Sequence, residues 1–303
     1  MISKTPPPLA LAALAVAMGS SIDGVVKALA EHDSVIVMMA WRFVFGAVLT
    51  LSVFIALRKK WPKANALRFH AFRGAIQASA AVLFFWSVTQ LALAEATTLG
   101  FTAALLIAPL AWLVLGERMT ALDVCAAAIG FVGAVFAVSG EADGAPDNAN
   151  RVLGALACLL AAALYAATLV LMRLRTREED ALTIVTMANL FCALWLSPVL
   201  VWTFPGIDPT RLPLYAGLGL GGVATWLVFT IAYANADAQK LAPLEYTALL
   251  WGGLIGYWAF QETPDWRLYP GAALIIAACT AIAVESRFAT RRAAKSPAAD
   301  PGL

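Results

Sequence analysis

Charged residues are scarce in this chain. Asp, Glu, Lys and Arg make up 13% of its 303 residues, whereas soluble domains contain about 25%. Hydrophobic residues make up 61%, and the mean hydropathy is +0.79. So little charge excludes an ordinary soluble domain and predicts an all-α polytopic membrane protein.

Residues for metal binding and catalysis are equally few. The chain has two His, both near the ends of apolar runs, and no H-E-x-x-H or G-x-S-x-G motif. We therefore expect no metal site, no cofactor and no enzyme, since each needs a reactive cluster. No filter loop or ring of like charges indicates a channel, and the net charge of +2 does not indicate nucleic acid. The cysteines lie in separate apolar runs without CxxC spacing, which predicts no disulfide framework: Cys125, Cys158, Cys192 and Cys279.

Long apolar runs fill almost the whole chain. Each has about 20 residues, the length that crosses the hydrocarbon core of a bilayer, and short knots of Pro, Gly and charge separate them. The start, MISKTPPPLALAALAVAMGSS, could pass as a signal peptide, but its removal would destroy the first run of the repeat described below. We expect ten transmembrane helices, at 8–28, 35–57, 69–91, 94–115, 119–139, 152–174, 181–204, 211–235, 239–260 and 267–286.

Basic residues are distributed unevenly between the connecting loops. Lys and Arg accumulate on the cytoplasmic side of membrane proteins. With the N-terminus inside, the RKKWPK and RLRTR loops and the basic tail at 287–303 are cytoplasmic, and the outer side has only three cations. Both termini are therefore predicted to be cytoplasmic. The outer cations would be Arg151, Arg211 and Arg267.

The chain resembles itself at an offset of about 145 residues. LGFTAALLIAPLAWLVLGERMT aligns with LEYTALLWGGLIGYWAFQETPD, so that Glu117 meets Glu262 and Leu254 stands where the first copy has Pro109. An odd number of helices per copy forces the two copies to cross the membrane in opposite senses, as in many secondary transporters. We predict two inverted five-helix repeats, at 8–140 and 151–286, joined by an outer loop at 141–150.

These stretches also carry a family resemblance. The sequence is similar to members of the drug/metabolite transporter superfamily of the EamA type, through ALLIAPLAWLVLGERMTALDV in the first copy and LAPLEYTALLWGGLIGYWAFQETPD in the second. DGVVKA and WRFVFG resemble the group that contains bacterial riboflavin and S-adenosylmethionine uptake carriers. The wider family also exports amino acids and other metabolites, so the resemblance implies a transporter but not its direction or solute.

Three charges lie in the first two predicted helices. Asp23 lies roughly 8 Å inside the outer boundary, Lys27 nearly at it and Arg42 about 10 Å inside it. Asp23 and Lys27 share a helix face at i and i+4, so we expect them to neutralise each other locally. Asp23 would bind a cationic group of the solute or a proton, with Lys27 or Arg42 as its alternating partner. The other interpretation is a structural clamp between the two helices.

Further candidate binding residues lie deeper in other predicted helices. Glu245 and Tyr246 follow Pro243, whose missing N–H interrupts a helix as in many transporter sites, although Glu245 could equally be a helix-start carboxylate. Arg73, within a turn of the inner boundary, is expected to snorkel to the interface, and Glu95 near the outer boundary is ambiguous. Polar and aromatic side chains could line a pocket or simply pack: Gln77, Trp86, Tyr165 and Trp226.

Turn or gate residues close the fourth and ninth helices at opposite faces. They are Pro109, Glu117, Arg118, Pro243 and Glu262. The sequence thus predicts a secondary active transporter that moves a small metabolite (a vitamin, nucleoside-like, amino acid or amine solute) across the bacterial inner membrane, as a monomer or homodimer. An exporter of the same fold, a structural membrane protein and a membrane-embedded enzyme remain as alternatives.

Overall fold

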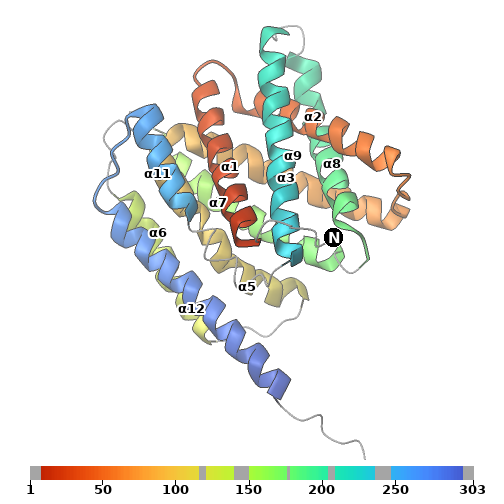
Figure 1. Cartoon of the computed structure of the whole chain (residues 1–303). Coiled ribbons are helices and arrows are strands. Elements are labelled where there is room, and N and C mark those ends of the chain that lie inside the picture. Colours follow the sequence, from red (N-terminus) through yellow and green to blue (C-terminus); the bar gives the residue numbers. More distant parts are fainter. Residues whose placement is uncertain are drawn as a thin grey trace, which may run out of the picture.

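The computed structural model describes residues 8–115, 121–139, 150–175, 178–203, 209–235 and 247–295. These residues form helices and short connections, without a sheet (Figure 1). The first part of the chain contains α1 (Pro8–Leu29), α2 (Val35–Ala56), α3 (Ala64–Gln90), α4 (Leu93–Gly100), α5 (Thr102–Leu115) and α6 (Ala121–Val138). The second contains α7 (Arg151–Arg175), α8 (Ala181–Thr203), the 3-10 turn η2 (Pro209–Arg211), α9 (Leu212–Asn235), α11 (Thr247–Phe260) and α12 (Leu268–Lys295).

Most helices follow the predicted runs, with three differences. α3 begins at Ala64 instead of 69, and α12 continues to Lys295 instead of ending at 286. The predicted run at 94–115 is divided at Phe101 into α4 and α5. Parts of the predicted 239–260 helix, the 141–150 loop and the tail lie outside the described residues. Among the described residues, five helices are long and apolar enough to cross a membrane: those within Ala10–Leu29, Val35–Ala56, Ala64–Gln90, Arg151–Leu171 and Leu182–Thr203.

Helices from the two halves pack against each other throughout the bundle. α2 packs on α8 and α9, α3 on α7 and α8, and α1 on α9 and α11. α6 lies along α12, which extends beyond the bundle (Figure 1). Their backbones meet at Gly133 and Gly271, since a Cβ on Gly271 would lie 2.6 Å from the Gly133 carbonyl oxygen. Only glycine permits so close an approach.

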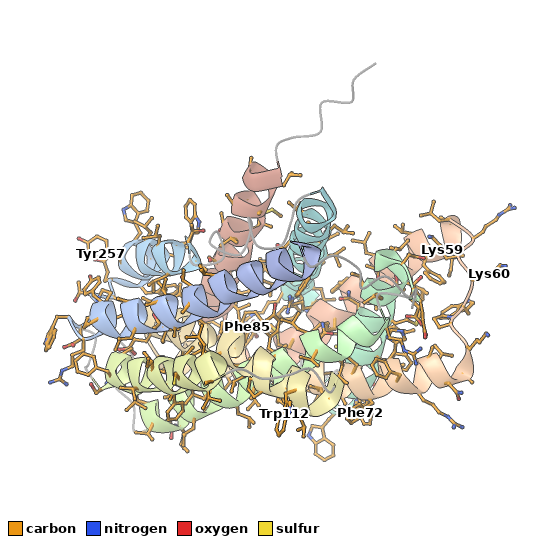
Figure 2. All side chains as sticks on the ribbon, turned by 90° about the horizontal axis from the view of Figure 1, so that it is seen from below. Lys59, Lys60, Phe72, Phe85, Trp112 and Tyr257 are labelled. Carbon is orange, nitrogen blue, oxygen red and sulfur yellow. The ribbon has the colours of Figure 1, made fainter. Side chains whose placement is uncertain are left out.

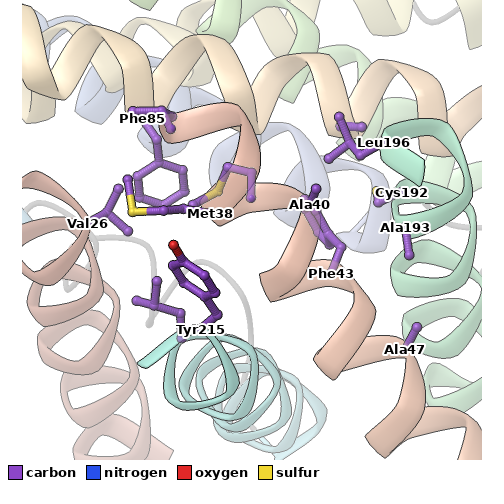
Figure 3. Packing of buried hydrophobic residues seen from close by; sticks show 14 residues of the cluster. Val26, Met38, Ala40, Phe43, Ala47, Phe85, Cys192, Ala193, Leu196 and Tyr215 are labelled. Atoms are coloured by element: carbon purple, nitrogen blue, oxygen red, sulfur yellow. The ribbon is translucent and has the colours of Figure 1, made fainter. Parts of the chain in front are cut away.

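A hydrophobic core lies between α1, α2, α3, α8 and α9. Val26, Met38, Phe85 and Tyr215 are buried there and point toward one another (Figure 3). A second buried cluster joins α3, α4 and α5 to α6, α7 and α12, with Leu91 and Ile275 among its members. The helices therefore pack as one bundle, and their side chains interdigitate in its two buried clusters.

Large apolar side chains cover the outside of the bundle. Trp202 and Trp258 are 88% and 84% exposed, and Leu113 is 72% exposed. Figure 2 shows Trp112 and Tyr257 pointing away from the ribbon, whereas Lys59 and Lys60 extend from one end. Such an apolar exterior suits lipid rather than water.

The two ends of the bundle are named as follows. The end where α1 and α3 finish is called the outer end, and the end where α3 begins is called the inner end.

Candidate functional site

Asp23 and Arg42 lie in the interior of the bundle on α1 and α2. Within the part of the chain that the structure describes, Asp23 has no hydrogen bond and no ion pair, although its charge attracts that of Arg42. The Arg42 guanidinium stacks over the rings of Phe43 and Phe85, 5.2 and 5.4 Å from their centroids. It also packs on Gly222 of α9, where an added Cβ would lie 2.9 Å from its Nη2. The two opposite charges therefore share a region without a direct bond.

Two buried polar atoms on α3 and α9 also lack partners. The Gln77 side-chain oxygen on α3 and the Thr225 hydroxyl on α9 have no hydrogen bond among the described residues. Thr225 lies three residues after Gly222, and its methyl group would be 3.8 Å from a Cβ on Gly19, one turn before Asp23. Unsatisfied buried polar groups are costly, so such atoms point to a missing ligand or solvent. Sequence reasoning missed Thr225, because a single Thr in an apolar helix carries no signal.

The predicted aromatic residues are spread over the bundle. Trp86 is half-buried against the core of α1, α2 and α3, and Trp226 is half-buried on α9. Tyr165 is 40% exposed on α7, a helix that packs on α3, α4 and α5. A binding role for Tyr165 stays a prediction.

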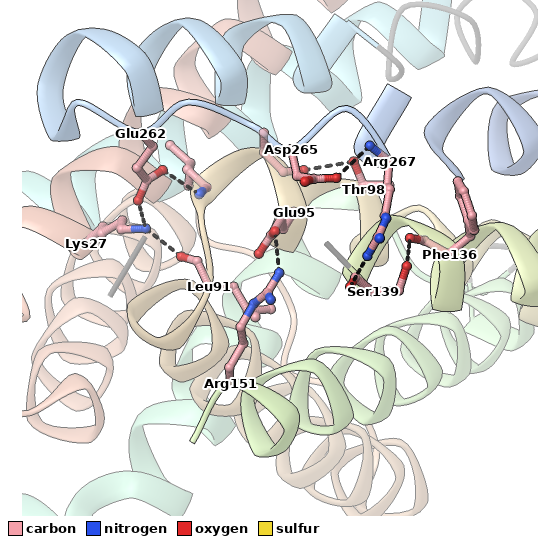
Figure 4. A network of polar contacts seen from close by, with 12 residues as sticks. Lys27, Leu91, Glu95, Thr98, Phe136, Ser139, Arg151, Glu262, Asp265 and Arg267 are labelled. Carbon is pink, nitrogen blue, oxygen red and sulfur yellow. Dashed lines mark hydrogen bonds and ion pairs between the residues drawn. The ribbon is translucent and has the colours of Figure 1, made fainter. Parts of the chain in front are cut away.

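Lys27 does not pair with Asp23, so the expected local pair is wrong. Its ammonium group donates a hydrogen bond to Glu262, beyond α11, and another to the Leu91 carbonyl oxygen at 2.6 Å. The Glu262 carboxylate also accepts a hydrogen bond from the Leu93 backbone N–H at 2.8 Å (Figure 4). Hydrogen bonds from Lys27 to two distant groups outweigh an i,i+4 pair worth about 0.2–0.5 kcal/mol.

A second buried ion pair lies beside the first. Arg151, at the start of α7, donates to Glu95 on α4 at 2.6 Å, and Glu95 is 2% exposed (Figure 4). Lys27 and Glu262 each interact electrostatically with Glu95. At the same outer end, Arg211 donates to Asp33 at 2.5 Å. Sequence reasoning left Glu95 ambiguous, since its partner lies 56 positions away.

Polar contacts at the inner end join the start of α3 to the start of α8. The Arg73 side chain is 3% exposed and donates to the Ile184 carbonyl oxygen at 3.1 Å, so the expected snorkelling is wrong. His70 contacts Glu179 at 2.6 Å through Nε2. Lys59 donates to Asp180 at 3.1 Å, and both side chains are more than a third exposed.

Asp180 caps α8 at this end. Its carboxylate accepts from the Thr183 N–H and hydroxyl, both at 3.1 Å. Partial burial raises the pKa of Asp180, but these hydrogen bonds and the charge of Lys59 outweigh it and hold the pKa below the ordinary value of 3.8. This carboxylate is thus a structural cap.

The structure describes only some of the residues that bear on the predicted gate and on the expected absence of a metal site. Glu117, Arg118, Pro243, Glu245 and Tyr246 lie outside the described residues. Pro109 lies inside α5, and a gating role for it stays a prediction. Across the described ranges, no three His, Cys, Asp or Glu side chains could hold a metal ion together.

Comparison with known proteins relates the chain to transporters. The EamA-like transporter family model matches residues 7–139 and again residues 152–284. A riboflavin transporter of Brucella anthropi is 27% identical over 251 residues, 80% of this chain and 86% of the relative. An S-adenosylmethionine uptake transporter of Rickettsia prowazekii is 23% identical over 240 residues, 78% of this chain and 79% of the relative.

A solved structure agrees with the fold. This crystal structure superposes with a TM-score of 0.61 at 20% identity, covering 92% of this chain and 97% of the other. That similarity shows a shared fold, while the two family matches confirm the resemblance carried by the GERMT and QETPD stretches. The apolar helices and the family together identify a multi-pass membrane protein. The chain belongs to the EamA-like transporter family.

Proposed function

We propose that the chain is a secondary active transporter that moves a small metabolite across the bacterial inner membrane by alternating access. It would work without catalysing a reaction. Its family supports transport, and the printed name of the Rickettsia relative supports uptake as the direction. The observation that carries the proposal is the Asp23 and Arg42 region, because charged groups inside a membrane bundle are costly unless they serve a partner or a solute.

We also propose that two inverted five-helix repeats form the ten-helix transporter, with both termini cytoplasmic. Two separate family matches support this. The packing supports it as well, because exchanging each helix for its counterpart turns the α1–α9 contact into α7–α3, and the α2–α9 contact into α8–α3. The α2–α8 and α6–α12 contacts map onto themselves under the same exchange. An axis in the membrane plane between the copies would produce this reciprocity.

The solute would bind near Asp23 and Arg42 with the unpaired atoms of Gln77 and Thr225. A cationic or hydrogen-bonding group would face Asp23 and the polar atoms, and an apolar or aromatic part would contact Phe85 and its neighbours. The names of the relatives make riboflavin and S-adenosylmethionine the first compounds to test.

Thermal denaturation with added solute tests this site. Detergent-purified protein is heated with riboflavin, S-adenosylmethionine, amino acids and amines, and active compounds are then tested for uptake into proteoliposomes. A ligand that binds only the folded state raises its melting temperature in a dose-dependent manner. We expect Asp23→Asn to lose that shift. Glu178→Gln is the matched control, since Glu178 pairs with Arg175 and is 65% exposed.

A binding role for Asp23 and a structural clamp predict different results. Transport that is unchanged in Asp23→Asn at equal expression would remove Asp23 from the site. The absence of a shift for every compound, together with lower stability of Asp23→Asn alone, would favour the structural clamp.

A further inference from the structure

Lys27 and Glu262 close a break in the main chain at the outer end. α3 and α4 are separated by Leu91 and Ala92, which have extended backbone dihedrals. The Leu91 carbonyl oxygen accepts from Lys27, and the Leu93 N–H donates to Glu262. We call these four groups the outer latch (Figure 4).

The charges of the outer latch match the helix ends that they contact. Leu91 lies at the carboxyl end of α3, where a cation is favoured, and Leu93 is the first residue of α4, where an anion is favoured. The backbone groups at such ends have no partner within their own helices. The latch therefore satisfies two helix ends and joins α1 to the segment after α11.

The burial of the outer latch limits how it can open. Lys27 and Glu262 side chains are 7% and 3% exposed. Separating a buried pair is strongly unfavourable when either charge is left without a partner. Opening of the outer end thus requires a second acceptor for Lys27.

Two carboxylates are candidates for the second acceptor of Lys27. Glu95 attracts Lys27, but Arg151 already holds it at 2.6 Å. Asp23 precedes Lys27 by four residues, on the same face of α1, and has no hydrogen bond or ion pair in the described part of the chain. Asp23 is therefore the better second acceptor.

We propose that Lys27 alternates between Glu262 and Asp23, so that occupation of Asp23 closes the outer end. When the outer end is open, Lys27 pairs with Asp23. A solute cation or a proton that takes Asp23 releases Lys27, which then donates to Glu262 and to the Leu91 carbonyl oxygen. The inference rests on the proposed function, because it assigns to the same site the control of its own access.

Cysteine accessibility tests the outer latch without any solute. Thr97 on α4 faces α11, since a Cβ on Gly252 would lie 2.8 Å from its hydroxyl oxygen. Thr97→Cys is made in a background in which the four native cysteines are replaced, and labelling by a maleimide is timed in detergent. Detergent makes the result independent of membrane orientation.

Substitutions of Glu262 and Asp23 should change the labelling rate in opposite directions. Glu262→Gln removes the closed-state acceptor and leaves Asp23 as the open-state acceptor, so labelling should rise about tenfold if the open state is a minor population. Lys27→Met removes the donor of both states, so its labelling should lie between the background and that of Glu262→Gln. Asp23→Asn removes the open-state partner, so labelling should fall below the background. Asp23→Asn combined with Lys27→Met should behave as Lys27→Met alone, because Lys27 is then absent.

Control variants separate this inference from simple loss of structure. Lys27→Arg keeps the charge and Glu178→Gln changes an exposed carboxylate, so both should label at the background rate; gel filtration checks folding of each. Unchanged labelling in Glu262→Gln, or a rise in Asp23→Asn, would overturn the proposal. A fall in Glu95→Gln instead of Asp23→Asn would also overturn it. Lost transport in Asp23→Asn with unchanged labelling would reject the latch and leave the proposed function intact.

Discussion

The two ends of the bundle use ion pairs in different ways. At the outer end, Lys27–Glu262 and Arg151–Glu95 are largely buried and join α1, α4, α7 and the segment after α11. At the inner end, Lys59–Asp180 and Arg175–Glu178 each have a side chain that is more than 40% exposed to solvent. His70–Glu179 is largely buried there, but it is an ion pair only when His70 is protonated. Exposed pairs contribute about 0–1 kcal/mol, whereas breaking a buried pair costs about 3–5 kcal/mol. Substitution of a paired side chain should therefore lower the stability of the protein more at the outer end than at an exposed pair of the inner end.

Glu262→Gln should have the largest effect. It leaves Lys27 buried beside a neutral amide, and the free energy of unfolding should fall by about 3–5 kcal/mol. Unfolding in mixed micelles with increasing SDS measures this change.

A double variant checks the cause. Lys27→Met combined with Glu262→Gln leaves no uncompensated charge, so it should be more stable than Glu262→Gln alone. If the double variant is the less stable of the two, the charge explanation is wrong.

Glu95→Gln should have an intermediate effect. Gln keeps an acceptor for Arg151 but removes the charge, and a hydrogen bond to a charged group contributes about 1.5–3 kcal/mol. The loss should lie below that of Glu262→Gln, because the Arg151 side chain is 20% exposed and its charge can be hydrated. The same SDS titration ranks the two variants, and a larger loss in Glu95→Gln would contradict the comparison.

Asp180→Ala should have the smallest effect. Loss of the α8 cap costs about 1 kcal/mol, and Asp180→Asn, which can still cap, should cost less. The folded pKa of Asp180 lies below 3.8, so its charge stabilises the fold above that pH, and the contribution disappears as the pH falls through the lowered pKa. Melting temperatures should thus differ between the wild type and Asp180→Asn less at pH 3 than at pH 7; an equal difference at both would contradict this.

The helical framework is largely readable from the sequence, while helix ends depend on other forces. α3 starts at Ala64 because its polar first turns find partners, such as Glu179 for His70, that a count of apolar residues ignores. α12 passes 286 because Ala, Arg and Lys are strong helix formers even outside an apolar run. Hydropathy reports where a chain enters lipid, and helical propensity reports where a helix can end.

The candidate site was readable only in part, for a related reason. The intramembrane positions of Asp23 and Arg42 follow from run lengths, whereas the partner of Lys27 lies 235 positions away. A sequence displays neighbours at i+4 directly, but a pair such as Arg151 and Glu95 exists only after α4 and α7 have packed together. Local pairing was thus overestimated at Lys27, and Thr225 was invisible.

The contacts of Lys27 and Glu262 with the main chain affect tolerance to mutation. In their contacts with the main chain, Lys27 donates to the Leu91 carbonyl oxygen and Glu262 accepts from the Leu93 N–H, and neither contact uses an atom that distinguishes one amino acid from another. Apolar substitutions at these two positions, or at Ala92 between them, therefore leave the hydrogen-bonding groups in place. Proline at 93 is the exception, because it has no N–H to donate. A library of variants across 91–93 should accordingly keep the hydrogen bonds of the outer latch with every apolar residue except proline at 93, whereas the buried packing of Leu91 and Leu93 should limit which of these variants are stable.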